Sequence, residues 1–249
     1  MKRVLLSIVA TCSLLNAGGY KVPEQSADSL GLAASNVAFS FGADAAYFNP
    51  ANMMFLDGLH HFESTLGWFH INSIDFKSDD GKRYSSKKFD SLAGTFSFVT
   101  PEIYENWRFG LALAVPAAVG ISWEDPETAF TGKRFKLQVV ELNPTVAYRI
   151  NDKLAIALGA RGVYSKGKIA SDFGRFGYRE IQGDGINYGY NVALTYRPIE
   201  ELSFAVTYRS KVNLELKGSA DADFNGALAA ISYHGKTRVE IPLPAQLVL

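Results

Sequence analysis

Hydrophobic and polar residues alternate along most of the chain from Leu59 onward, with the two-residue period of a β-strand. In the clearest stretch, Leu154, Ile156 and Leu158 share one face, whereas the residues between them are small. The same alternation predicts strands over 59–71, 89–100, 107–122, 137–150, 154–168, 186–197 and 202–217, with an eighth beginning near 238. The chain is therefore predicted to be an all-β protein.

The length and spacing of these strands distinguish a membrane barrel from a soluble sandwich. Most of the strands run for about 12–16 residues, against about 5–6 in soluble proteins. Short connections (101–106, 151–153, 198–201) alternate with long polar ones (72–88, 123–136, 169–185, 218–237). Tyrosines stand near the strand ends at 148, 164, 196 and 208. Short inner turns, long outer loops and an aromatic girdle are typical of antiparallel transmembrane barrels, so the smaller, more polar face is predicted to line the lumen.

The first 17 residues have the features of a secretory signal peptide. Two basic residues precede an apolar run over 4–15, and the small residue Ala17 follows it. A short membrane anchor is the alternative, but a spanning helix needs about 20 apolar residues. A lipoprotein site at Cys12 is a second alternative, although Thr11 stands where a smaller residue is expected. We expect cleavage after Ala17 and export of the remaining chain.

Charge and composition exclude several classes of function. The chain has 25 basic and 25 acidic residues, and a net charge of zero gives no indication of nucleic-acid binding. Loss of the leader leaves 23 basic and 25 acidic residues and no cysteine, so no disulfide or cysteine-based site is expected. The histidines, at 60, 61, 70 and 234, have no zinc-binding spacing, and no serine-hydrolase or phosphate-loop pattern occurs. We expect neither an enzyme nor a bound cofactor or metal.

Residues 18–58 differ from the rest because they are rich in Ala, Ser and Gly and lack clean alternation. A short helix or turn is expected within 27–38. The breaker Asn49-Pro50-Ala51 stands just before the first strand, since proline removes a backbone donor and keeps Asn49 out of the helical region. A compact segment of this kind is a natural plug for a barrel lumen. The predicted organisation is thus a signal peptide (1–17), a plug (18–58) and barrel strands (59–249).

Several stretches match one family in order. They are Gly19-Tyr20, Glu24, Leu30-Gly31-Leu32-Ala33, Asp44 and Asn49-Pro50-Ala51, followed by 141–169, 183–218 and 241–249. In this order they resemble the N-terminal hatch and following strands of the FadL family of outer-membrane transporters for long-chain fatty acids and other hydrophobic compounds. The resemblance covers essentially the whole chain after the leader. Asn-Pro-Ala alone is a weak signal, whereas the ordered set is specific.

The resemblance implies a monomeric 14-stranded barrel in the cell outer membrane, plugged by an N-terminal hatch and working by passive uptake. Substrate would be captured among outer loops, passed to a luminal pocket and released sideways through a kink in the third strand, with Pro116 and Gly120 as candidates. The implied partners are hydrophobic molecules, outer-membrane lipid and lipopolysaccharide, and the barrel-insertion machinery. Only seven to eight strands fit within this chain, so we expect it to be the first part of the barrel.

Candidate ligand residues fall into three groups, each with a packing alternative. From the hatch, the pocket is expected to be lined by Phe39, Phe41, Phe48, Met53, Met54 and Phe55, which could equally pack the plug on the wall. In the wall, Arg161 faces inward by alternation, and Lys166 aligns near a basic position of the family. Either could bind a carboxylate, or could pair with an acid such as Glu141. In the last outer loop, Phe224, Leu228 and Ile231 could form a capture groove or only a loop core.

Two other functions remain open from the sequence. The same fold could take up aromatic hydrocarbons or alkanes instead of fatty acids. The chain could also belong to a surface barrel, an adhesin or structural protein, whose plug never moves.

Overall fold

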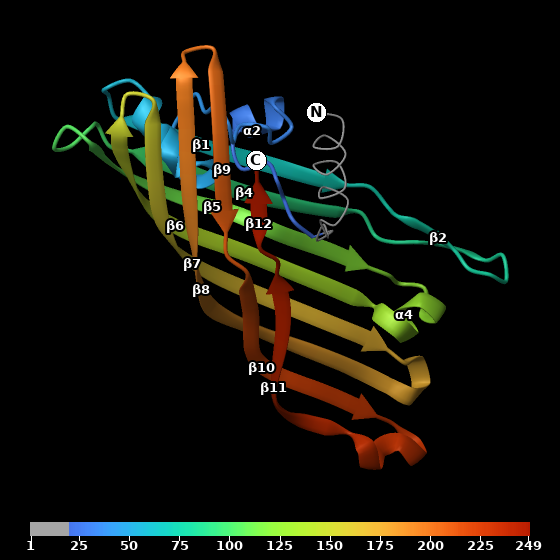
Figure 1. Cartoon of the computed structure of the whole chain (residues 1–249). Helices are drawn as coiled ribbons and strands as arrows, with labels where there is room; N and C mark the ends of the chain where they lie inside the picture. Colours follow the sequence, from blue (N-terminus) through green and yellow to red (C-terminus); the bar gives the residue numbers. More distant parts are fainter. Residues whose placement is uncertain (1–19) are drawn as a thin grey trace, which may run out of the picture.

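The computed structural model describes residues 20–249 as one curved antiparallel sheet with the N-terminal segment, residues 20–58, on its inner face (Figure 1). The predicted signal peptide and Gly19 of the predicted hatch motif lie outside the described residues. Among residues 20–249, no helix has both the length and the apolar character needed to cross a bilayer.

The sheet is a ladder of neighbouring strands, all paired antiparallel. In pairing order they are β1 (His61–Ile71), β4 (Phe89–Val99), β5 (Trp107–Ser122), β6 (Arg134–Asn151), β7 (Leu154–Asp172), β8 (Gly177–Ile199), β10 (Val212–Phe224) and β11 (Tyr233–Leu243). Two shorter strands, β9 (Leu202–Arg209) and β12 (Gln246–Val248), pair with each other, and β9 also pairs with β8. Within the described residues β1 and β11 do not pair, so the sheet stays open.

The seventh and eighth predicted strands are each interrupted. Only Ser210 and Lys211 separate β9 from β10, which both pair with β8. Only Pro244 and Ala245 separate β11 from β12. A proline cannot donate to a ladder, which accounts for the second break. The two interruptions lie beside each other, because β10 pairs with β11 and β9 pairs with β12.

Predicted strand positions are confirmed, but the outer ends run further than predicted. β8 begins at Gly177 instead of 186, and β10 continues to Phe224. These extensions are polar on one face and mostly small on the other, so the hydrophobic alternation is weak, while the backbone ladder to β7 continues from Asp184 to Tyr178. The predicted long loops also contain a small hairpin, β2 (Asp75–Lys77) with β3 (Arg83–Ser85), and α4 (Pro126–Gly132).

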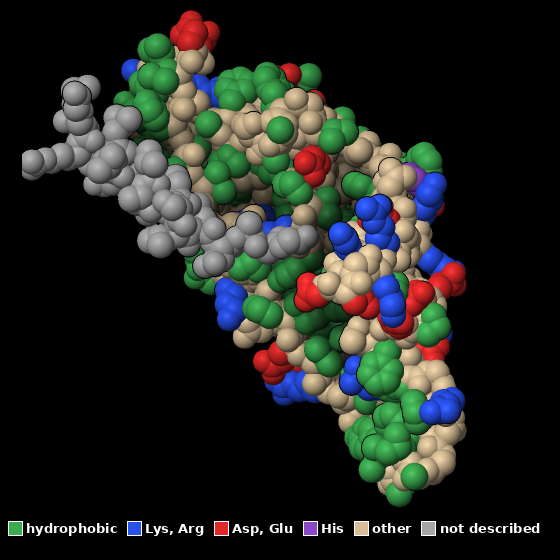
Figure 2. All heavy atoms as spheres, turned by 90° about the vertical axis from the view of Figure 1, so that its right-hand side faces the viewer, with side chains coloured by type: hydrophobic (Ala, Val, Ile, Leu, Met, Phe, Trp, Pro, Cys, Tyr) green, Lys and Arg blue, Asp and Glu red, His purple; other side chains and the backbone are tan. Residues whose placement is uncertain are grey.

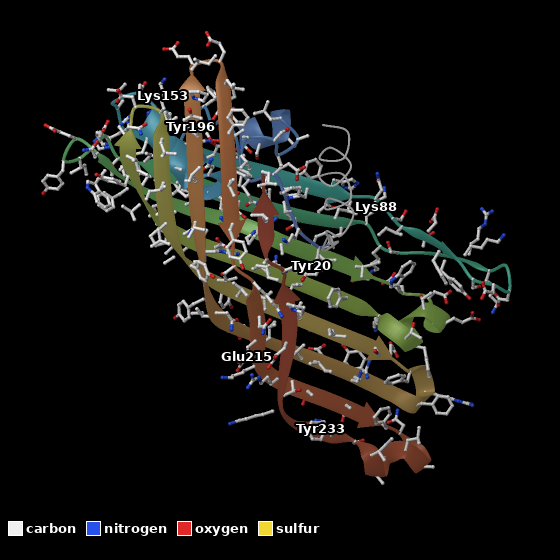
Figure 3. All side chains as sticks on the ribbon, viewed as in Figure 1. Tyr20, Lys88, Lys153, Tyr196, Glu215 and Tyr233 are labelled. Carbon is white, nitrogen blue, oxygen red and sulfur yellow. The ribbon has the colours of Figure 1, made fainter. Side chains whose placement is uncertain are left out.

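The two ends of the sheet differ. The short turns gather at one end, which Lys153 and Tyr196 mark, and Tyr233 lies toward the other (Figure 3). The connections with β2, β3, α4, η2 (Gly174–Phe176) and η3 (Gly226–Ile231) lie at that second end. This arrangement agrees with the predicted division into turn and loop ends.

The N-terminal segment is built from short helices with defined caps. α2 (Ala27–Gly31) begins with a reciprocal capping box between Ser26 and Ser29. It fills the first part of the region where a short helix was predicted. α3 (Ala45–Phe48) and the 3₁₀ helix η1 (Pro50–Phe55) follow, joined at Asn49. Pro50 starts η1 because a fixed φ and a missing N–H suit the first position of a helix.

This segment packs on the wall through small residues. One core cluster joins Ala46, Met53 and Met54 to wall alanines such as Ala112 and Ala147. Gly110 lets the two approach, since a Cβ there would lie 2.5 Å from the Met53 sulfur and 2.9 Å from the Ala46 Cβ. The small inner face predicted from alternation is therefore the surface that accepts the segment.

The outer face of the sheet is an apolar band. Large side chains exposed along β6, β7 and β8 include Leu142, Ile156, Leu158, Tyr164, Ile186, Tyr188 and Leu194. Water would disfavour a band of this size on a soluble monomer, whereas a lipid-facing wall requires it.

Candidate functional site

The start of the N-terminal segment lies along β5. The Val22 amide donates to the Pro116 carbonyl at 3.0 Å, and the Ala118 amide donates to the Tyr20 carbonyl at 3.0 Å. The Gln25 side chain accepts from the Val115 amide at 2.7 Å and donates to the Val115 carbonyl at 3.0 Å. A buried side-chain amide thus replaces a missing strand partner at this point of the wall.

The strand beneath this contact is irregular. Ala114 pairs with Glu141 and Ala117 with Val139, so Val115 and Pro116 face a single residue of β6. This is a one-residue β-bulge, which bends and twists a strand. Pro116, the predicted kink residue, lies in this bulge. Gly120 lies beyond it in regular pairing, and leaves room there for the Phe89 ring.

The bulge adjoins a gap in the ladder between β4 and β5. These strands pair only from Phe96–Leu113 to Val99–Gly110. The rest of β4, Phe89–Thr95, has no partner on β5, although it pairs with β1. The wall therefore has a weak point at which residues 20–25 lie against the inner face.

A buried ion cluster occupies the middle of the lumen-facing wall. Arg161 donates to both Glu141 carboxylate oxygens, at 3.1 and 2.8 Å, and to the Ser210 carbonyl at 2.6 Å. Arg209 donates to the same carboxylate and, at 2.9 Å, to the Tyr47 carbonyl. The side chains of Arg161 and Glu141 are 3% and 0% exposed. One carboxylate between two guanidinium groups compensates the charge of only one of them.

Lys21 brings a third cation to this cluster. Burial, and then the positive charges of Arg161 and Arg209, lower the pKa of Lys21 to about 8. Its ammonium lies 3.4 Å from the Pro244 carbonyl, and it forms no ion pair within residues 20–249. Tyr20 reaches the same wall, where its hydroxyl donates to the Pro242 carbonyl. The start of the segment thus contacts both β5 and the strand β11–β12.

The two predicted wall cations differ in position. Arg161 faces the lumen, where it pairs with Glu141, the acid considered as the packing alternative. Lys166 lies on the opposite, outward face of β7 with Tyr164, so its prediction as a luminal ligand residue is wrong. The physical reason is parity, because residues an odd number apart on a strand point to opposite faces.

The predicted aromatic lining of the hatch is mostly engaged in packing. Phe39 and Phe55 lie on the Arg197 guanidinium, with centroid distances of 4.7 and 4.5 Å. Phe41 packs edge-to-face on Phe39 at 4.8 Å, and its side chain stays exposed. Phe48 packs on Tyr47. Met53 and Met54 are fully buried in the core cluster between the segment and the wall.

The Asn-Pro-Ala motif attaches the segment to β8. The Asn49 side-chain oxygen accepts from the Ala51 amide at 3.1 Å, which caps η1. Its side-chain nitrogen donates to the Val37 carbonyl at 2.7 Å and to the Thr195 hydroxyl at 2.8 Å. Thr195 in turn donates to Asn52 at 2.7 Å. Glu24, by contrast, makes no side-chain hydrogen bond or ion pair within residues 20–249, and the neighbouring Gln25 makes the wall contact.

The outer connections meet through aromatic rings. Phe173 packs on Phe130 at 5.1 Å and stacks on Phe224 at 5.5 Å. Leu228 and Ile231 of η3 are exposed, 41% and 62%. Figure 2 views this end and shows hydrophobic side chains gathered at its lower edge. Phe224 thus belongs to a three-ring cluster, while Leu228 and Ile231 remain on the surface.

Sequence reasoning missed several of these residues. The contacts of Gln25, Thr195 and Arg209 depend on how the N-terminal segment packs on the wall, which the sequence does not show. Arg209 carried one signal, because its position in the alternation of β9 places a cation on the small, lumen-facing side.

The comparisons with known proteins agree with this geometry. The family described as "Outer membrane protein transport protein (OMPP1/FadL/TodX)" matches residues 7–249. A long-chain fatty acid transport protein of Escherichia coli K12 is 26% identical over 85% of this chain and 55% of its own length. Outer membrane protein P1 of Haemophilus influenzae is 26% identical over 70% of this chain and 43% of its own. This chain thus spans about half the length of these relatives.

Solved structures share the fold. A Pseudomonas aeruginosa FadL homologue superimposes with a TM-score of 0.72 at 16% identity, covering 92% of this chain and 64% of that one. The toluene transporter TbuX of Ralstonia pickettii gives 0.67 at 20% identity, covering 86% and 64%. The matching family consists of transport proteins, which supports the prediction of a non-enzyme. This chain belongs to the FadL/TodX family of outer-membrane transport proteins, and its sheet is part of an outer-membrane β-barrel wall.

Proposed function

We propose that this protein carries hydrophobic molecules, long-chain fatty acids foremost, passively across the outer membrane. Residues 18–58 act as the hatch, and residues 59–249 as the first part of the barrel. The observation that carries the proposal is the bulge at Val115–Pro116, beside the part of β4 that does not pair with β5, with residues 20–25 bound over it. A wall opening held shut by the plug is what a sideways exit needs.

The route begins among the outer connections, where exposed Leu228 and Ile231 offer apolar surface. Transfer of an alkyl chain from water stabilises capture by about 0.8 kcal/mol for each buried CH₂ group. Withdrawal of Tyr20–Gln25 from β5 would then free the opening. Four hydrogen bonds hold that contact, two from the backbone and two from Gln25, so a modest change in binding energy suffices to release it.

The charge of the ion cluster favours a carboxylate as the ligand head. In the described part of the chain, Arg161 and Arg209 share the single carboxylate of Glu141, and Lys21 adds a third positive charge that both guanidinium groups repel. A fatty-acid carboxylate would compensate part of this excess in a medium of low dielectric constant. A relative named as a long-chain fatty acid transport protein supports the same substrate class.

Uptake of neutral hydrocarbons is the second candidate, supported by the likeness to toluene transporters. The two candidates differ at the cation cluster, since toluene has no charge to pair with it. A permanently plugged surface barrel is the third candidate.

The test is uptake of labelled oleate and labelled toluene by outer-membrane vesicles that contain or lack the protein. Deletion of Pro116 removes the extra residue and should let β5 pair in one register. We expect oleate uptake to fall at least tenfold. Insertion into the membrane, measured by protease protection, should be unchanged. Equal oleate uptake with and without the protein would favour the permanently plugged barrel, and saturable uptake of toluene alone would favour the hydrocarbon channel.

A further inference from the structure

Four cations gather on the outward face of the wall at its loop end. They are Arg134 and Lys136 of β6 and Lys166 and Lys168 of β7, named here the β6–β7 basic patch. Arg134 and Lys166 are exposed, and Lys136 and Lys168 are partly exposed. Each lies on the face opposite the buried residues of its strand, so the patch belongs to the outer surface and takes no part in the lumen.

The register brings like charges together. Lys136 lies directly opposite Lys168, and Lys166 faces Gln138 two pairs further along. Directly opposite residues have Cβ atoms about 4.5–5.5 Å apart, where like charges repel. Such an arrangement lowers folding stability unless something outside the sheet compensates the charge.

Carboxylates of the chain compensate the patch only in part. Glu180 pairs with Lys168 at 2.6 Å, and Asp184 is the register partner of Lys166 on β8. Lys136 lies 5.9 Å from the centre of the Phe89 ring. Within residues 20–249, Arg134, Lys136 and Lys166 form no ion pair. The patch thus keeps a positive excess.

A neighbouring region of the same face is balanced by comparison. Lys217 pairs with Glu215 at 2.9 Å, and Arg238 pairs with Glu215 at 2.9 Å and with Glu240 at 2.6 Å. Lys236 of this region forms no ion pair within residues 20–249, so three cations share two carboxylates here. In the β6–β7 basic patch only one of four cations, Lys168, forms an ion pair, so the excess of cations is larger there.

The height of the patch matches the lipid headgroups. The apolar face of β7 runs from Leu154 to Tyr164, ten residue steps, and Lys166 follows. Ten steps along a strand tilted by about 40° span about 25 Å of membrane normal, the height of the apolar band in such barrels. The cations thus lie just beyond the hydrocarbon, at the end with the long loops, which faces outward in these barrels.

We propose that the β6–β7 basic patch binds the phosphate groups of a phosphorylated glycolipid in the outer leaflet. A phosphate between Lys136 and Lys168 would accept charge-assisted hydrogen bonds from both ammonium groups. The acyl chains of the same lipid would lie on the apolar band below. The proposal rests on the outer-membrane location and is independent of what the protein transports.

Binding of lipid A to the purified, folded protein in detergent micelles tests the proposal. Lipid A with two phosphates, one phosphate or none is titrated against the wild type and two triple variants. Lys136→Gln, Lys166→Gln and Lys168→Gln together remove the patch. Lys217→Gln, Lys236→Gln and Arg238→Gln remove the same charge at the balanced region of the same face.

We expect the wild type and the control to prefer the diphosphorylated lipid by at least tenfold over the dephosphorylated one, and to lose this preference in high salt. The patch variant should lose about fivefold in affinity for each cation removed. If the wild type binds all three lipids with equal affinity, the proposal is wrong whatever the variants show. Equal losses in both variants would overturn the assignment to β6 and β7. Inorganic pyrophosphate that binds as tightly as the lipid would overturn the lipid as the ligand.

Discussion

Asn49 and Thr195 lie 146 positions apart in the sequence, and the Asn49 amide donates a hydrogen bond of 2.8 Å to the Thr195 hydroxyl. Asn49 is fully buried, and the same side chain also caps η1 and binds the Val37 carbonyl. One residue therefore ends α3, begins η1 and ties both to the wall. This gives the Asn-Pro-Ala motif a structural role, as the joint between the N-terminal segment and β8.

Asn49→Ala should loosen this joint. Loss of a buried group with several partners costs about 1–3 kcal/mol. We expect faster hydrogen exchange at residues 45–55, and less-than-additive effects when Asn49→Ala is combined with Thr195→Val, because the two residues share a bond. Asn213→Ala on the exposed face of β10 is the control and should leave exchange unchanged. Additive effects in the double variant would contradict the coupling.

Gly110→Ala should displace the N-terminal segment. A Cβ at this position would lie 2.5 Å from the Met53 sulfur and 2.6 Å from the Thr145 hydroxyl, so one of the neighbours must move. Overpacking of this kind costs about 1–3 kcal/mol of unfolding free energy, measured by denaturation in micelles. Gly94→Ala on β4 meets nothing within 4 Å and should change stability by less than about 0.5 kcal/mol. Similar losses for both would show that the effect is not one of packing.

Glu141→Gln should be among the most destabilising single changes in the wall. It leaves Arg161 and Arg209 buried together without a carboxylate, and breaking a buried pair costs about 3–5 kcal/mol. Glu102→Gln is the matched control, because its ion pair with Arg149 at 2.9 Å is partly exposed. Such a pair contributes about 1 kcal/mol or less. Equal costs, measured by thermal unfolding of the two proteins, would show that burial of the cluster is not decisive.

Fatty-acid binding should depend on the protonation of Lys21. The pKa of Lys21 is lowered to about 8, chiefly by burial. The ammonium is therefore present below pH 8 and lost above it, while the ligand carboxylate is ionised throughout. We expect constant oleate affinity from pH 6.5 to 7.5 and a fall above pH 8, by at most tenfold for each pH unit.

The control for this pH dependence is Lys153→Met, a change in the exposed turn between β6 and β7 (Figure 3). It should keep the fall in affinity, whereas Lys21→Met should bind oleate more weakly and without the fall. A wild-type profile that is flat to pH 9.5 would contradict a role for Lys21 in carboxylate binding. Affinity for toluene should not change with pH in any of the three proteins.

The positions of the strands could be predicted because each strand has one lipid-facing and one lumen-facing side. In β5, predicted and observed limits coincide at Trp107 and Ser122. The prediction failed where this contrast weakens, as in Gly177–Gly185 of β8, where one face is polar and the other is mostly glycine. Backbone pairing continues there without a hydrophobic signal, because hydrogen bonds of a ladder do not depend on side-chain polarity.

The candidate site was predicted less completely. The kink at Pro116 could be proposed because proline has no N–H to donate. Lys166 was misplaced because it was assigned by similarity to a basic family position. The alternation of β7 puts it on the outward face. The partners of Arg161 could not be selected, since Glu141 and Ser210 lie on other strands and only the register decides which residues face it.

By itself, the sequence determined the strands, the sidedness of each strand and the presence of a plug-like segment, because these follow from local alternation and from breakers such as Pro50. The tertiary structure decided where the plug touches the wall, which charges share Glu141 and where β4 and β5 separate. These features depend on residues far apart in the chain, and the pairing register, which local sequence does not encode, sets their distances.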